Sequence, residues 1–127
     1  MLELTINEVV YQFNFGMGFM REINRRICAP IDGMPSVKKN IGLRYMVSGI
    51  VDGDLEALVD ILEAANKGQN PRLTRQALDA YIDDEATDID ALFDQVTDFL
   101  KRTNATRRIT NEILEVVEKQ KAEMEKK

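Results

Sequence analysis

The sequence predicts a small α+β domain that is mainly helical. An N-terminal β-hairpin is covered by about six short helices, and a C-terminal helix projects from them. Two observations support this fold class. The first 14 residues contain two short runs with the alternation or the β-branched composition of strands. From Phe15 onward, apolar residues recur every three or four positions, which is the period of an amphipathic helix.

The chain has the size of one domain, because 127 residues of which 44% are hydrophobic suffice for one core. We expect this single domain, residues 1–127, to comprise a β-hairpin over 1–14, a helical core over 15–103 and a C-terminal helix over 104–127. Charged residues predominate beyond Val117. We therefore expect the end of the last helix to project and to be disordered in the free protein.

The hairpin prediction rests on two runs separated by two polar residues. Residues 2–6 alternate apolar and polar side chains, as a strand with one buried face does. Residues 9–14 are rich in β-branched and aromatic side chains. Asn7 and Glu8 fit a two-residue turn, although Glu8 stands where glycine is preferred, so we expect a weaker turn than Asn-Gly. A two-stranded hairpin is marginal in water, so helices must cover it.

The next part of the chain predicts two helices joined by a loop. Apolar residues at every fourth position predict a helix over 15–27, and two glycines in its first turn favour a later start. Two prolines and a glycine predict a loop over 29–35. Ser36 is the expected N-cap of a helix that continues to Ile50. Because this helix is apolar nearly all round at 45–47, we expect it to be central in the core.

Four more helices follow, and polar residues mark their starts. Asp54 precedes one apolar stripe and Thr74 precedes another. Thr87, with Asp90 three residues later, resembles a capping box before the clearest amphipathic stripe in the chain. The last helix is expected to begin at Asn104.

The composition excludes several classes of function. Asp+Glu number 22 against 17 Lys+Arg, a net charge of −5, whereas nucleic-acid binding needs concentrated basic side chains. No histidine is present to serve as a general base or metal ligand, and the single Cys28 cannot form an internal disulfide. No apolar run is long enough to span a membrane. We expect a non-enzymatic protein of a reducing compartment, with no cofactor or metal and no nucleic-acid or membrane partner.

The acidic stretch 83–98 has three interpretations. It contains seven carboxylates and no Lys or Arg. A calcium loop needs oxygens at alternating positions and a glycine at its bend, and this stretch has no glycine. The pattern therefore favours carboxylates that stabilise a helix start and continue as a solvated face. An acidic docking surface for a basic partner is the remaining alternative.

The C-terminal helix carries the candidate partner-binding residues. Its apolar stripe can pack on the core, as in an average helix, or bind a partner. Beyond the stripe only Ala122 and Met124 are apolar, so the final turns have little to bury. We therefore assign partner binding or self-association to four residues, Ile109, Ile113, Val116 and Val117.

An ordered set of segments resembles one protein family along nearly the whole chain. None of these segments is a chemical motif, so the specificity lies in their order. The segments are 4–7, 11–24, 39–43, 52–58, 65–68, 71–74, 79–84 and 99–106. Together they resemble the tail assembly chaperones of long-tailed, siphovirus-type bacteriophages and prophages of Gram-positive bacteria.

The resemblance implies a function in virion assembly. It implies a non-enzymatic factor that binds the tape measure protein, keeps it soluble and promotes polymerisation of the major tail tube protein around it. It also implies action in the host bacterial cytoplasm and absence from the mature virion. A frameshifted longer form of the protein is implied as a further partner, for which Lys126 and Lys127 are compatible with a slippery codon pair. Self-association is a further expectation. The alternative is a structural tail completion or connector protein, and a DNA-binding regulator is disfavoured by charge.

Overall fold

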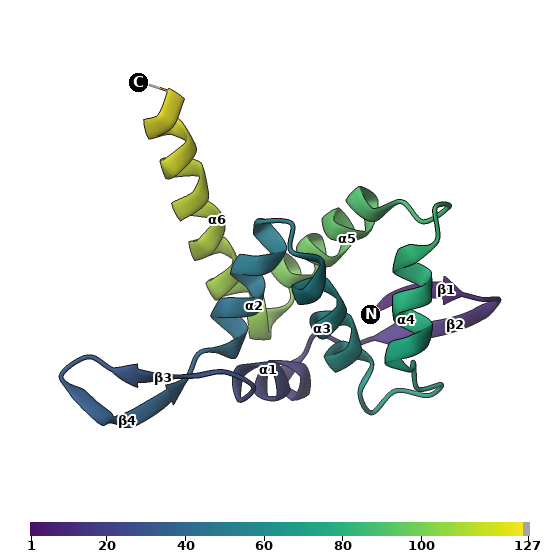
Figure 1. Cartoon of the computed structure of the whole chain (residues 1–127), viewed down its shortest axis with the longest axis horizontal. Helices are drawn as coiled ribbons and strands as arrows, with labels where there is room; N and C mark the ends of the chain where they lie inside the picture. The colour runs from purple at the N-terminus through teal and green to yellow at the C-terminus, as the bar shows by residue number, and fades with distance from the viewer. Residues whose placement is uncertain (126–127) are drawn as a thin grey trace.

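The computed structural model describes residues 1–125, and over them the chain forms six helices and two antiparallel hairpins (Figure 1). In chain order the elements are β1 (Leu2–Ile6), β2 (Val9–Phe13), α1 (Met17–Asn24), β3 (Cys28–Ile31), β4 (Met34–Asn40), α2 (Gly42–Val51), α3 (Leu55–Asn66), α4 (Arg75–Asp83), α5 (Ile89–Arg102) and α6 (Asn104–Glu125). The mainly helical fold with an N-terminal hairpin and a long last helix is confirmed. The division at residues 14 and 103 stays a prediction.

The β1–β2 hairpin lies at one end of the molecule and has the expected register. Leu2 pairs with Phe13 and Ile6 pairs with Val9, which leaves Asn7 and Glu8 as the turn. Both turn residues have positive φ, 54° and 68°, as the favoured two-residue hairpin turn requires. The apolar side chains of β1 are buried, and α3 and α4 pack against the hairpin.

The core is centred on α2 and α3, as predicted for the helix around residues 45–47. Met46 and Val47 are buried, although the neighbouring Tyr45 is 59% exposed. The start of α2 lies directly on the end of α1. A Cβ atom added to Gly42 would stand 1.9 Å from the backbone oxygen of Ile23, so only glycine permits this approach.

The predicted loop at 29–35 and the helix start at Ser36 are wrong. This segment forms the β3–β4 hairpin, and the helix begins only at Gly42. Asp32 and Gly33 make the turn, with Gly33 at a φ of 82°. Asp-Gly between two strand-like runs is a strong hairpin signal, but the two prolines of this segment favoured the prediction of a loop. Prolines are tolerated here because both strands lie at sheet edges, where a missing N–H breaks no ladder.

The helix starts agree with the expected caps at Asp54 and Thr74 and differ, besides Ser36, at Thr87. Asp54 and Thr74 accept hydrogen bonds from backbone amides of the first turns of α3 and α4. The predicted cap at Thr87 is wrong, because its hydroxyl donates instead to the backbone oxygen of Tyr81 at 2.7 Å. Asp88 caps α5, where its charge is also favourable at the helix N-terminus.

Asn66 is a buried polar residue that joins three segments. Its amide nitrogen donates to the backbone oxygens of Gln12 (3.0 Å) and Pro71 (3.3 Å). Its side-chain oxygen accepts from the backbone amide of Leu73 (2.6 Å) and from Arg72 (3.1 Å). Because all these polar atoms are paired, Asn66 can be fully buried and can fix β2 and the loop after α3 to the end of that helix.

Glu22 on α1 is the centre of an ion cluster that ties α1 to α3. It forms ion pairs with Arg25, with Lys67 (3.1 Å) and with Arg26 (3.3 Å), and Arg26 also reaches Glu63 on α3 (3.2 Å). The hydrogen bond from Arg25, then that from Lys67, lowers the pKa of Glu22 to about 2. The carboxylate therefore stays ionised well into the acidic range.

Candidate partner-binding surface

Helix α6 has a half that packs on the core and a half that projects beyond it (Figure 1). In the packed half, Thr106 and Thr110 are buried, and their hydroxyls donate to backbone oxygens at 2.7 and 2.8 Å. Ile113, 8% exposed, is the last buried residue of the helix. From there to Glu125 each side chain is half-buried or exposed. The projection predicted from the sequence is present, and α6 remains helical to the last described residue.

The structure divides the four predicted binding residues into two groups. Ile109 packs against the core and Ile113 belongs to it. Val116 is 54% exposed, and Val117 is half-buried. The single stripe seen in the sequence therefore becomes a packed pair followed by an accessible pair. Val116 is the most exposed of the four, and Ile109 and Val117 are both half-buried, although only Ile109 of these two packs against the core cluster.

Two grooves flank the accessible pair. The α2–α6 groove, of about 520 Å³, is lined by Arg44, Ser48 and Asp52 from α2 and by Ile113, Val116 and Val117 among residues of α6. The α5–α6 groove, of about 630 Å³, lies on the other side of α6 and is lined by apolar residues that include Leu55, Phe93 and Leu114. Val117 lines both grooves. Val116 and Val117 thus form a short apolar edge beside these concave surfaces, at the start of the otherwise charged free half of α6.

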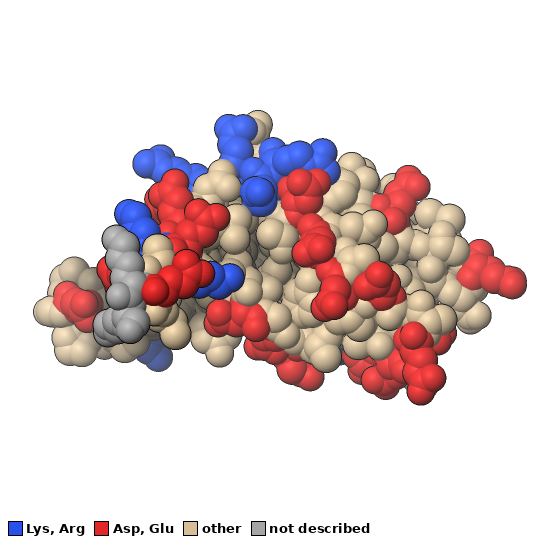
Figure 2. All heavy atoms as spheres, turned by 90° about the horizontal axis from the view of Figure 1, so that it is seen from above, with Lys and Arg blue, Asp and Glu red and all other residues tan. Residues whose placement is uncertain are grey.

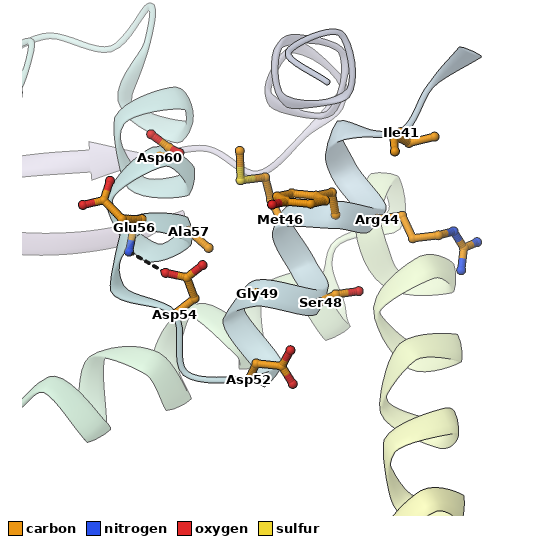
Figure 3. A pocket seen from close by; sticks show the side chains of 11 residues that line it. Ile41, Arg44, Met46, Ser48, Gly49, Asp52, Asp54, Glu56, Ala57 and Asp60 are labelled. Atoms are coloured by element: carbon orange, nitrogen blue, oxygen red, sulfur yellow. Dashed lines mark hydrogen bonds between the residues drawn. The ribbon is translucent and has the colours of Figure 1, made fainter. Parts of the chain in front are cut away.

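A third groove, which the sequence analysis missed, lies between α2 and α3 (Figure 3). This α2–α3 groove has a volume of about 610 Å³. Its apolar surface includes Met46, Ala57 and Tyr45, and Tyr45 is 59% exposed. The α2–α3 groove shares one row of lining residues with the α2–α6 groove: Arg44, Ser48 and Asp52, on α2 and at its C-terminal end. This row separates the two grooves. The sequence contains no signal for this surface, because residues 45–47 have the pattern of a buried run and the exposure of Tyr45 is seen only in the structure.

Comparison with known protein families identifies the chain. The family described as "Phage tail assembly chaperone protein, TAC" matches residues 3–115. The chain belongs to this phage tail assembly chaperone family. No curated protein matches the chain, and no solved structure matches it.

The family match covers each element up to the packed half of α6. It ends at residue 115, so Val116 and Val117 lie just beyond it, whereas the α2–α3 groove lies entirely within it. The family is one of assembly chaperones and not of enzymes, in agreement with the function predicted from the composition. The type of phage and the range of hosts stay predictions.

Acidic side chains dominate the grooved face of this tail assembly chaperone. Figure 2 shows carboxylates spread over the face that α6 rises from, with most Lys and Arg side chains toward one edge. At the centre, Arg44 donates to Glu112 at 3.0 Å, which joins α2 to α6 across the groove. Both partners are about half exposed, so this pair orients α6 more than it stabilises the fold.

The acidic stretch 83–98 has a structural use at several positions. Asp88 caps α5, Asp84 accepts from the backbone amide of Ala86 at 2.9 Å, and Asp98 pairs with Arg102 at 2.8 Å. Among residues 1–125, no group of three or more Cys, Asp or Glu is placed to hold a metal ion. The helix-start interpretation therefore accounts for part of the stretch, and a docking role for its remaining carboxylates stays a prediction.

Two further features complete the surface. Cys28 is exposed at the start of β3, and its thiol donates to the Asn40 side-chain oxygen at 3.1 Å. None of the helices described over residues 1–125 has the length and apolar character needed to cross a membrane.

Proposed function

We propose that this tail assembly chaperone binds the tape measure protein, keeps it soluble and promotes polymerisation of the major tail tube protein around it. Family membership supports a role in tail assembly. The observation that points to a helical client is the free half of α6, where exposed Val116 lines the α2–α6 groove and half-buried Val117 lines both grooves. An amphipathic helix laid beside α6 would bury its apolar face there, which is a common mode of helix recognition.

Three structural features favour this surface over the rest of the molecule. The exposed apolar residue lies on a helix and not on a loop, so a partner meets a segment that already has its secondary structure. The grooves on either side supply concave surface for two rows of client side chains. The surrounding carboxylates keep the exposed apolar surface soluble. By contrast, Ile109 and Ile113 support the site from beneath, because they anchor α6 to the core.

The test is co-expression with the tape measure protein encoded nearby in the same phage or prophage, followed by affinity capture of this chain. The proposal predicts that the client becomes soluble and co-purifies. Val116→Asp should weaken capture at least about tenfold, whereas Asn111→Asp, which adds the same charge at an exposed α6 position outside the grooves, should not. A client that is equally insoluble with and without the chaperone would refute the proposal.

The same proposal places the protein in the host bacterial cytoplasm during assembly and outside the mature virion. Mass spectrometry of purified particles distinguishes it from the alternative, a structural completion or connector protein, which would be present in each particle. The predicted frameshifted longer form rests on Lys126 and Lys127, which lie outside the described residues. Its test is detection of the longer product in infected cells.

A further inference from the structure

The α5–α6 groove is the more apolar of the two grooves that flank the free half of α6. Helices α5 and α6 diverge from their connection at Thr103, and the turn between α2 and α3 lies between them (Figure 1). Seven apolar side chains line this groove, whereas three line the α2–α6 groove. The seven are Ile50, Val51, Leu55, Ile89, Phe93, Leu114 and Val117.

Much of this apolar surface is accessible. Leu55 is 44% exposed, and the side chains of Ile89, Phe93, Leu114 and Val117 are each half-buried. They come from the start of α5, the start of α3 and the middle of α6, so they form one surface with walls on two helices. A groove of this kind can bury the apolar stripe of a helix from another molecule.

Carboxylates stand on both walls of the α5–α6 groove. Asp90 and Asp94 are one helical turn apart on α5, and Glu118 lies on α6. All three are exposed, and among residues 1–125 none of them takes part in an ion pair. Lys121 is the one cation among the described residues that line the groove. The groove therefore presents an apolar surface between walls of net negative charge.

The α2–α6 groove differs, because its central carboxylate is already paired. Arg44 reaches Glu112 across that groove at 3.0 Å, and Arg108 approaches the same carboxylate at 4.0 Å. A cationic side chain that entered there would compete with Arg44. In the α5–α6 groove, a cation would instead meet carboxylates that have no other ion partner, so this groove is the one whose charge a partner can complement.

We propose that the α5–α6 groove selects a cationic amphipathic helix, in which an apolar stripe is flanked by Lys or Arg. The stripe covers Phe93, Leu114 and Val117, and the flanking cations pair with Asp94 and Glu118 on the opposite walls. A helix with the same stripe flanked by Asp or Glu is rejected, because its carboxylates would face those of the groove. The inference rests on the proposed function and adds the chemical class of the tape measure helix that is bound.

Fluorescence anisotropy with two designed peptides tests the inference on the full chain. Both peptides are about 20 residues long, which is enough to form a helix, and share one stripe of Leu and Ala. One peptide carries Lys beside the stripe and the other carries Glu. The wild type should bind the Lys peptide at least about tenfold more tightly than the Glu peptide, and high salt should reduce the difference.

Charge-reversed variants assign the preference to the groove. D94K/E118K changes the two walls, and the control D79K/E123K makes the same change in net charge at exposed positions of α4 and α6 outside the grooves. D94K/E118K should bind the Lys peptide at least about tenfold more weakly than the wild type and the Glu peptide more tightly, whereas D79K/E123K should keep the wild-type preference. The milder D94N/E118Q should weaken binding of the Lys peptide by about threefold. Circular dichroism should show the same helical content in each variant, because the changed residues are exposed.

Three results would overturn the inference: no binding of the Lys peptide to the wild type, equal binding of the two peptides, or an equal loss in D94K/E118K and D79K/E123K. The outcome is distinct from that of the co-expression test. If the tape measure protein co-purifies equally well with the wild type and with D94K/E118K, the proposed function holds and the selectivity of the groove is refuted. If the peptides show the expected preference but the tape measure protein is never captured, the selectivity holds and the proposed function is refuted.

Discussion

Replacing Ile113 and Val116 separately distinguishes the packed half of α6 from its free half. Ile113 is 8% exposed and belongs to the core, so Ile113→Ala removes buried methyl and methylene groups and leaves a cavity. Such substitutions cost about 2–4 kcal/mol of unfolding free energy. Val116 is 54% exposed, and Val116→Asp at a solvated helix position should cost less than about 0.5 kcal/mol.

The assay combines thermal unfolding with client capture. For a domain of this size about 1 kcal/mol corresponds to roughly 4 °C, so Ile113→Ala should lower the melting temperature by about 8–16 °C. Val116→Asp should change it by less than about 2 °C but should weaken capture of the client. Ile113→Ala should retain capture at temperatures where it is folded. If Val116→Asp lowers stability as much as Ile113→Ala does, the division of α6 into two halves is wrong.

Three further predictions concern the fold that supports this surface. Since the pKa of Glu22 is about 2 in the folded chain and 4.5 ordinarily, its contribution to stability is present above pH 4.5 and is lost as the pH falls toward 2. Glu22→Gln should therefore cost about 1–2 kcal/mol of unfolding free energy at pH 7 and much less near pH 2 in denaturant titrations. This cost is smaller than the full pKa shift corresponds to, because two of the cations that pair with Glu22 are more than half exposed. Gly42→Ala should prevent native packing of α1 on α2, seen as lost near-UV circular dichroism, because the added Cβ meets the backbone oxygen of Ile23. Asn66→Ala should cost about 3–5 kcal/mol in denaturant titrations, since it leaves the buried Leu73 amide and other polar groups unpaired, and a cost below about 1 kcal/mol would contradict this.

Local patterns in the sequence predicted most of the fold. Alternation over residues 2–6 and capping by Asp54 and Thr74 are local effects, so the sequence displays them directly. The β3–β4 hairpin was missed because its two prolines indicate a loop. A strand can contain proline when it lies at the edge of a sheet, and both strands of this hairpin are edge strands, which the local sequence does not show. The change of cap from Thr87 to Asp88 depends on the preceding helix, which takes up the threonine hydroxyl.

The proposed binding surface was predicted only in part, because its limits depend on tertiary packing. The apolar residues of α6 keep the same helical spacing along the whole stripe. The sequence therefore does not show where the core beneath the stripe ends. That limit lies between Ile113 and Val116, because Ile113 is buried whereas Val116 is 54% exposed. The α2–α3 groove lies between two consecutive helices, and its shape depends on how they pack together, so no local pattern marks it.

Hydrogen–deuterium exchange of the chaperone alone and in complex with the tape measure protein tests the central claim most directly. Helix α6 is solvated beyond Ile113, so its amides should exchange readily in the free protein. In the complex, amides at residues 114–121 should become protected, and peptides of the β1–β2 hairpin should exchange as before. Protection confined to the β1–β2 hairpin or α4, with α6 unchanged, would contradict the account.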